Sequence, residues 1–120
     1  MKFADYQILP DYMEQAEVEK YCILILQEAS LETVNQTLCK LKEMGNRQWH
    51  TYRLPSKEFQ QELKQWLIQS WTSNTDEFLE YVLVISFDFG LDKEFYKKAL
   101  DLYRGKNQRE FQHKIGRAHV

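Results

Sequence analysis

Histidine and cysteine are the side chains of this 120-residue sequence best suited to act as a general base, a nucleophile or a metal ligand. His50 could serve as a general base, but no nucleophile or second acid can be assigned to it. Cys22 stands in an apolar run and Cys39 beside an expected helix face, so we predict two packed thiols. The sequence has no glycine-rich phosphate loop, Gly-x-Ser-x-Gly, His-Glu-x-x-His or Cys-x-x-Cys motif. We predict a protein that is not an enzyme and holds no metal or other cofactor, with an enzyme around His50 as an alternative.

The segment from Arg47 to Arg53 combines aromatic and basic residues and is the sharpest local feature. If it forms a strand, Trp49 and Arg53 lie on one face and Tyr52 on the other. One face could then offer an aromatic and guanidinium platform to a protein or to single-stranded nucleic acid. The alternative is a structural strand in which Trp49 packs on a helix and Arg53 pairs with an acid.

The first 32 residues are acidic, with seven Asp or Glu against two Lys, and aromatic residues stand among them. An acidic, aromatic surface suits docking onto a basic protein, because it can imitate a polyanion and steer association. A solvated acidic edge is the alternative. The predicted partner-binding residues come from this region and from the aromatic and basic segment: Tyr6, Asp11, Tyr12, Glu14, Glu17, Trp49, Tyr52 and Arg53.

The elements expected to position these residues begin with a β-α-β unit. Residues 21–26 form a short apolar run with β-formers, which favours a buried strand. Apolar residues from Leu31 to Met44 recur at helical spacing, with Ser30 as the expected N-cap and Gly45 as the expected C-terminal cap. Residues 48–54 are aromatic and β-branched and end at a proline, which predicts a second strand, parallel to the first if both join one sheet.

The C-terminal half is expected to be helical, which makes the predicted fold class α+β. Ser56 should cap a helix over residues 59–71, and Asp92 should cap a helix that Gly105 ends, before another begins at Asn107. Residues 80–89 suit either a helix, capped by Asn74 and followed by Gly90, or a third strand. We choose the helix; a strand would instead give a regular α/β domain.

Length and composition set the frame for these elements. We expect one globular domain over residues 1–114, truncated at its C-terminus, because residues 115–120 match what a common sequencing adapter encodes. The net charge of −2 is too nearly balanced to imply nucleic-acid binding by bulk electrostatics. The longest apolar run, residues 81–85, is too short to cross a membrane, and no secretory signal is recognisable, which predicts a cytoplasmic protein.

The stretch from Trp66 to Asn107, with its Phe-Gly-Leu-Asp connection at residues 89–92, resembles the C-terminal helical part of small bacterial immunity proteins. These accompany polymorphic or contact-dependent toxins. The resemblance covers about half the chain and implies a cytoplasmic, non-catalytic inhibitor of one cognate toxin, without assigning any binding residue. The alternative function is a nucleic-acid-associated regulator that uses the segment from Arg47 to Arg53 and the basic C-terminal helices. The oligomeric state is not predicted.

Overall fold

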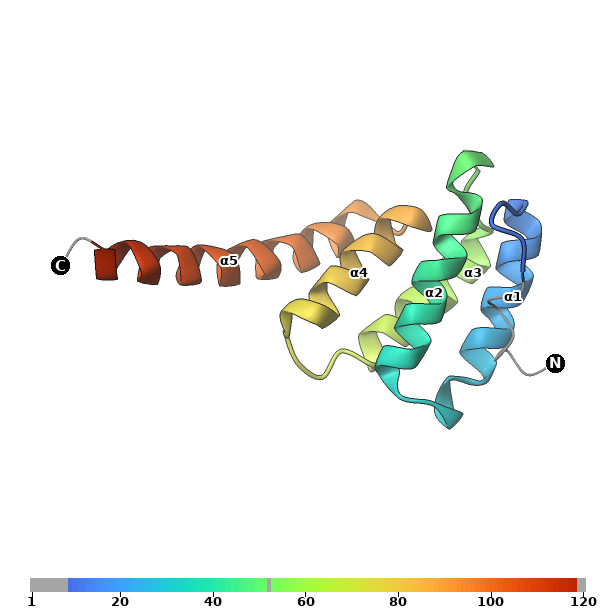
Figure 1. The fold of residues 1–120 in the computed structure, drawn as a ribbon. Helices are drawn as coiled ribbons and strands as arrows, with labels where there is room; N and C mark the ends of the chain where they lie inside the picture. Colours follow the sequence, from blue (N-terminus) through green and yellow to red (C-terminus); the bar gives the residue numbers. More distant parts are fainter. Residues whose placement is uncertain (1–8, 52, 119–120) are drawn as a thin grey trace.

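The computed structural model describes residues 9–51 and 53–118, without the side chains of Trp49 and residues 106–118. The described residues form five α-helices and two short 3-10 turns, with no strand among them (Figure 1). The turns are Ala29–Leu31 and Trp49–Thr51. The helices are α1 (Gln15–Gln27), α2 (Val34–Gln48), α3 (Lys57–Gln69), α4 (Asp76–Asp88) and α5 (Lys93–Ala118).

The predicted α+β fold with its β-α-β unit is therefore wrong, and so is its α/β alternative. The first expected strand, residues 21–26, lies inside α1. Val18, Cys22 and Ile25 are its buried residues, and their spacing of four and three is that of one helix face. The apolar run resembled a strand because α1 contacts both α2 and α3, so its core-facing surface is wider than that of a helix packed on one side.

The second expected strand is the end of α2 followed by the Trp49–Thr51 turn. Residues before α1 pack on this end, where the Met13 amide donates to the Arg47 carbonyl at 2.8 Å. The buried Arg47 guanidinium donates to the carbonyls of Pro10 at 3.1 Å and Glu43 at 2.9 Å. The bond from Met13 satisfies one of the backbone oxygens that a helix end otherwise leaves free, and the Arg47 side chain ties the same end of the helix to Pro10. The helix α2 runs through Gly45 to Gln48 instead of ending at the glycine.

Capping residues account for most of the helix starts. The predicted caps Ser56 and Asp92 are confirmed: their side chains accept from the amides of Phe59 at 3.2 Å and Phe95 at 2.9 Å. Thr33, not Ser30, precedes α2: its side chain and that of Gln36 bond each other's amides, a capping box.

The helix chosen for residues 80–89 is confirmed as α4, although Thr75 caps it instead of Asn74. Gly90 follows with a φ of +66°, the left-handed conformation expected after a helix. Gly105 does not end the next helix, because α5 continues past it and past Asn107 without a break. Figure 1 shows α4 lying between α2 and the first turns of α5, whose later turns extend away from the other helices.

Candidate functional site

An apolar surface on α4 is the starting point of the candidate site. The buried face of α4 includes Phe78, Val82 and Ile85, at helical spacing. The helix also carries Leu83 and Val84, which are only half-buried, and Phe87, which is 76% exposed. Consecutive apolar residues cannot all point to one side of a helix. Part of the apolar surface of α4 therefore faces outward.

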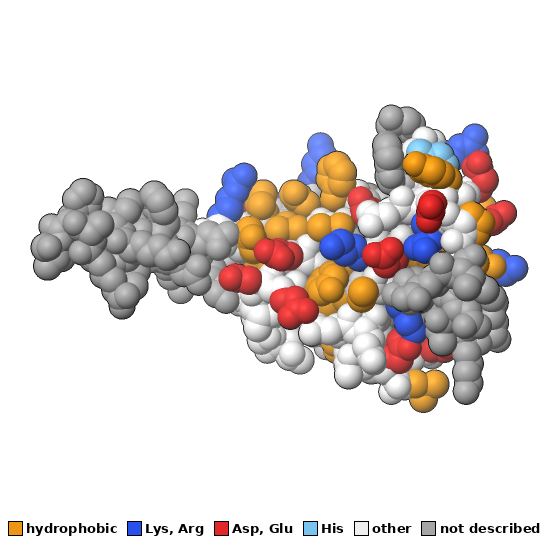
Figure 2. Space-filling view, in the orientation of Figure 1, with side chains coloured by type: hydrophobic (Ala, Val, Ile, Leu, Met, Phe, Trp, Pro, Cys, Tyr) orange, Lys and Arg blue, Asp and Glu red, His pale blue; other side chains and the backbone are white. Residues whose placement is uncertain are grey.

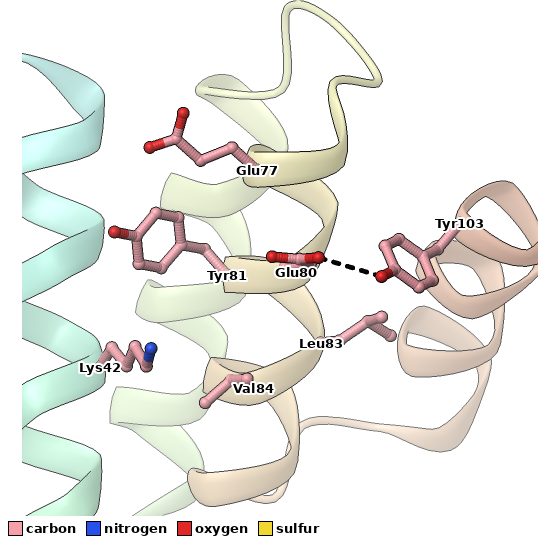
Figure 3. A pocket seen from close by; sticks show the side chains of 7 residues that line it. All are labelled: Lys42, Glu77, Glu80, Tyr81, Leu83, Val84 and Tyr103. Atoms are coloured by element: carbon pink, nitrogen blue, oxygen red, sulfur yellow. Dashed lines mark hydrogen bonds between the residues drawn. The ribbon is translucent and has the colours of Figure 1, made fainter. Parts of the chain in front are cut away.

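This outward face forms the floor of a groove of about 420 Å³ between α2 and α5 (Figure 3). We call it the α4 groove; it is lined by Lys42 of α2, by Glu77, Glu80, Tyr81, Leu83 and Val84 of α4, and by Tyr103 of α5. Phe87 stands four residues after Leu83 and three after Val84, so it continues the same helix face. Figure 2 shows acidic side chains beside hydrophobic ones over α4 and the adjoining part of α5.

Two tyrosines form part of the groove walls. The Tyr103 hydroxyl donates to the Glu80 carboxylate at 3.0 Å, which joins α5 to α4 across the groove. The Lys42 ammonium lies 5.8 Å from the centroid of the Tyr81 ring, a cation–π contact between α2 and α4. Burial raises the pKa of Tyr81, and Cys39 and Glu77 raise it further. The Tyr81 phenol is therefore neutral at physiological pH and offers an uncharged hydroxyl.

Charge is unevenly distributed along the groove. Glu77 and Glu80 lie on the N-terminal half of α4, whereas Lys42 lies beside Val84 toward the other end (Figure 3). Both glutamates are exposed, and no salt bridge of theirs is found among the described residues. The groove thus offers an apolar floor with carboxylates at one end and an ammonium at the other.

The α2 side of the groove is held by a close approach to α4. A Cβ atom at Gly45 would lie 2.9 Å from the Asp88 Oδ2 atom and 3.0 Å from its Cβ atom. The Gln48 side chain donates to the Asp88 carbonyl at 2.9 Å and joins the C-terminal ends of the two helices. Burial raises the pKa of Asp88, while the charge of Lys42 acts in the opposite direction.

The α5 side is fixed through α3. The Gln60 side chain donates to the carbonyls of Phe89 at 2.9 Å and Gly90 at 3.0 Å, in the turn between α4 and α5. Lys64 forms a salt bridge with Asp92 at 2.7 Å, and together with the Phe95 amide it lowers the pKa of that carboxyl. Contacts from α3 therefore hold the turn that sets the course of α5 along the groove.

The described residues of the partner-binding prediction lie away from the groove. The exposed Tyr12 ring contacts His50 edge-on at 5.1 Å between centroids, so the acidic opening and the Arg47 to Arg53 segment do meet. Asp11, Glu14, Glu17 and Arg53 are exposed. The sequence predicted a strand with Trp49 on one face and Tyr52 on the other. This prediction is wrong for Trp49, which lies in a 3-10 turn. Tyr6 and Tyr52 lie outside the described residues.

The sequence prediction missed every residue of the α4 groove. The available signal was the apolar run of residues 81–85, which already suited a helix. A helix with apolar residues on adjoining faces must be covered on several sides or must expose part of that surface. The opposing residues Lys42 and Tyr103 come from other helices, and their position could not be read from α4 alone.

Cys22 is buried, and burial raises the pKa of its thiol above the ordinary value. Cys39 is half-buried next to Tyr81.

In the part of the chain that the structure describes, no three His, Cys, Asp or Glu side chains come together as metal ligands. Within the same part, no helix combines the length and apolar character needed to cross a bilayer. Comparison with protein-family models, with curated proteins and with solved structures finds no significant match.

Proposed function

We propose that this protein is a non-catalytic protein-binding module whose partner docks in the α4 groove. The observation that carries the proposal is the outward apolar surface of α4: Leu83 and Val84 line a groove with charged ends, and the exposed Phe87 continues their helix face. Exposed apolar surface with a polar rim is typical of protein interfaces.

The contacts around the groove add a second line of support. Bonds at Gln48 and Tyr103 tie α4 to α2 and to α5, and bonds at Gln60 tie the turn after α4 to α3. A partner that docks on such a surface loses little affinity to reordering of the groove, because the walls are already in place.

The more specific proposal is an immunity protein that acts in the cytoplasm and neutralises a cognate bacterial toxin. It rests on the resemblance of residues 66–107 to the helical part of such proteins, together with the acidic end of the groove. Toxins that act on nucleic acid carry basic surfaces, which complementary carboxylates attract. The nucleic-acid-associated alternative is weakened at Arg47, whose buried guanidinium bonds backbone carbonyls.

Affinity capture from a lysate of the source organism tests the module. Phe87→Glu places a charge on the apolar surface, and Leu31→Glu is the matched control, since Leu31 is 83% exposed and lies outside the groove. We expect wild type and Leu31→Glu to retain one partner and Phe87→Glu to lose it, with all three unfolding at similar temperatures. Equal capture by both variants would refute the groove as the docking site.

The toxin-specific form is tested by expressing the captured partner in a bacterial host. If the partner stops growth, co-expression of the wild-type chain should restore growth and Phe87→Glu should not. A captured partner that leaves growth unaffected contradicts the immunity function while leaving the binding module intact.

A further inference from the structure

The two ends of the α4 groove differ in what they can bind. Glu77 and Glu80 are exposed carboxylates, and the Glu80 side chain is held by the Tyr103 hydroxyl at 3.0 Å. A carboxylate already oriented by one hydrogen bond can still accept others, because each carboxylate has about four acceptor sites. This end suits a guanidinium or ammonium group, and the neutral Tyr81 hydroxyl does not repel such a group.

The rest of the floor has the spacing of a helix surface. Glu80, Val84 and Phe87 follow one another at intervals of four and three residues and span about 10 Å along α4. A second helix laid along α4 presents side chains at the same intervals, which is the arrangement in helix-in-groove recognition. One charged side chain of the second helix would then meet the Glu80 carboxylate, and two of its apolar side chains would meet Val84 and Phe87.

Lys42 adds a direction to this arrangement. Its ammonium lies against the Tyr81 ring and beside Val84, away from the glutamates (Figure 3). A basic residue placed near Lys42 would be repelled, whereas the same residue near Glu77 and Glu80 is attracted. The charges therefore favour one position of a bound helix over the reverse one.

We propose that the α4 groove binds a basic amphipathic helix of the partner protein, with an Arg or Lys side chain between Glu77 and Glu80 and two apolar side chains over Val84 and Phe87. This inference rests on the proposed function and adds the class of segment that is recognised. The occupant is a segment of another protein and not a second copy of this chain.

Two designed helical peptides of 15 residues test the proposal against the full chain. One carries Arg, Leu and Leu at positions i, i+4 and i+7 in an alanine and glutamine background, and the other has Gln in place of Arg. We expect the Arg peptide to bind about five- to tenfold tighter by fluorescence anisotropy, the size of one to two partly exposed charge pairs. The advantage should shrink as salt is raised.

The double variant Glu77→Gln/Glu80→Gln should abolish the advantage of the Arg peptide, while Gln at position 80 still accepts from Tyr103. Glu58→Gln/Glu62→Gln is the matched control, because it removes the same charge from exposed positions on α3. Equal affinity for the two peptides, or binding of neither, overturns the proposal. Self-association of the chain that Phe87→Glu abolishes also overturns it, because a second copy would then occupy the groove.

These outcomes are separate from those of the proposed function. If Phe87→Glu abolishes partner capture but Glu77→Gln/Glu80→Gln changes neither peptide nor partner affinity, the module stands and basic-helix recognition fails. If Phe87→Glu leaves partner capture unchanged, the proposed function itself fails.

Discussion

Replacing Gly45 with alanine tests the close approach of α2 and α4 on which one wall of the groove depends. Glycine to alanine inside an exposed helix raises the free energy of unfolding by about 1 kcal/mol. At Gly45 the new Cβ atom would meet Asp88 Oδ2 at 2.9 Å and Asp88 Cβ at 3.0 Å, and the second atom cannot swing aside. Forcing packed helices apart costs about 1–3 kcal/mol. We therefore expect Gly45→Ala to lower the free energy of unfolding by roughly 1 kcal/mol net.

Gly105→Ala provides the matched control, because no described atom beyond its chain neighbours and its own helix backbone lies within 4 Å of the Cβ position at this helical glycine. This variant should be as stable as wild type or up to about 1 kcal/mol more stable. Urea unfolding followed by circular dichroism measures both changes in free energy. The melting temperature of Gly45→Ala should fall by roughly 3–6 °C, and that of Gly105→Ala should stay unchanged or rise by up to the same amount. If Gly45→Ala stabilises the chain as much as Gly105→Ala does, α2 and α4 are not in the close contact described.

Two carboxyl groups give further predictions with opposite dependence on pH. Burial raises the folded-state pKa of Asp88 above 3.8, so its carboxylate lowers the stability of the fold at neutral pH. Asp88→Asn should therefore raise the free energy of unfolding at pH 7. Urea titrations at several pH values should show that this gain shrinks toward pH 4. A gain that does not change with pH would exclude burial of the charge as its cause. Asp92 has a lowered pKa, so its contribution is present above pH 3.8 and is lost as the pH falls through the folded-state pKa. Asp92→Ala should cost about 1 kcal/mol of unfolding free energy by the same assay at pH 7, and Asp92→Asn less, because Asn still caps α5. Equal losses in the two variants would show that the interaction with Lys64, and not the cap, stabilises the helix.

The C-terminal half of the fold was predictable because its signals are local. Ser56 and Asp92 precede apolar residues at helical spacing, and each proved to cap the helix that follows. Gly90 marked the turn after α4 correctly, since few other residues adopt a φ of +66° without strain. At Gly105 the same signal was wrong, because a glycine in a helix is tolerated at modest cost.

The N-terminal half was only partly predictable from local pattern. The helical spacing from Leu31 to Met44 correctly predicted the helix α2, whereas tertiary contacts decide the end of α2 and the form of α1. The end of α2 holds its helical form through bonds from Arg47 to Pro10 and from Met13 to Arg47, across more than thirty residues of sequence. In α1 the apolar run obscured the spacing of Val18, Cys22 and Ile25, which only the contact with two neighbouring helices explains.

The candidate site divides in the same way. Exposure of Tyr12 and Arg53 agrees with the expectation that they are available to a partner, while binding by either residue stays a prediction. The α4 groove depends on Lys42 and Tyr103, which are 61 residues apart in sequence and line the same groove only after α2, α4 and α5 have packed.

The most direct test of the central claim is a titration of the methyl-labelled chain with its purified captured partner, followed by NMR. Leu83 and Val84 supply methyl groups inside the α4 groove, and Leu31 and Leu54 supply exposed methyl groups outside it. Docking in the groove predicts saturable shifts of the Leu83 and Val84 methyl signals at one partner per chain, with the other two signals unchanged. Unchanged Leu83 and Val84 signals in a chain saturated with partner would contradict the account.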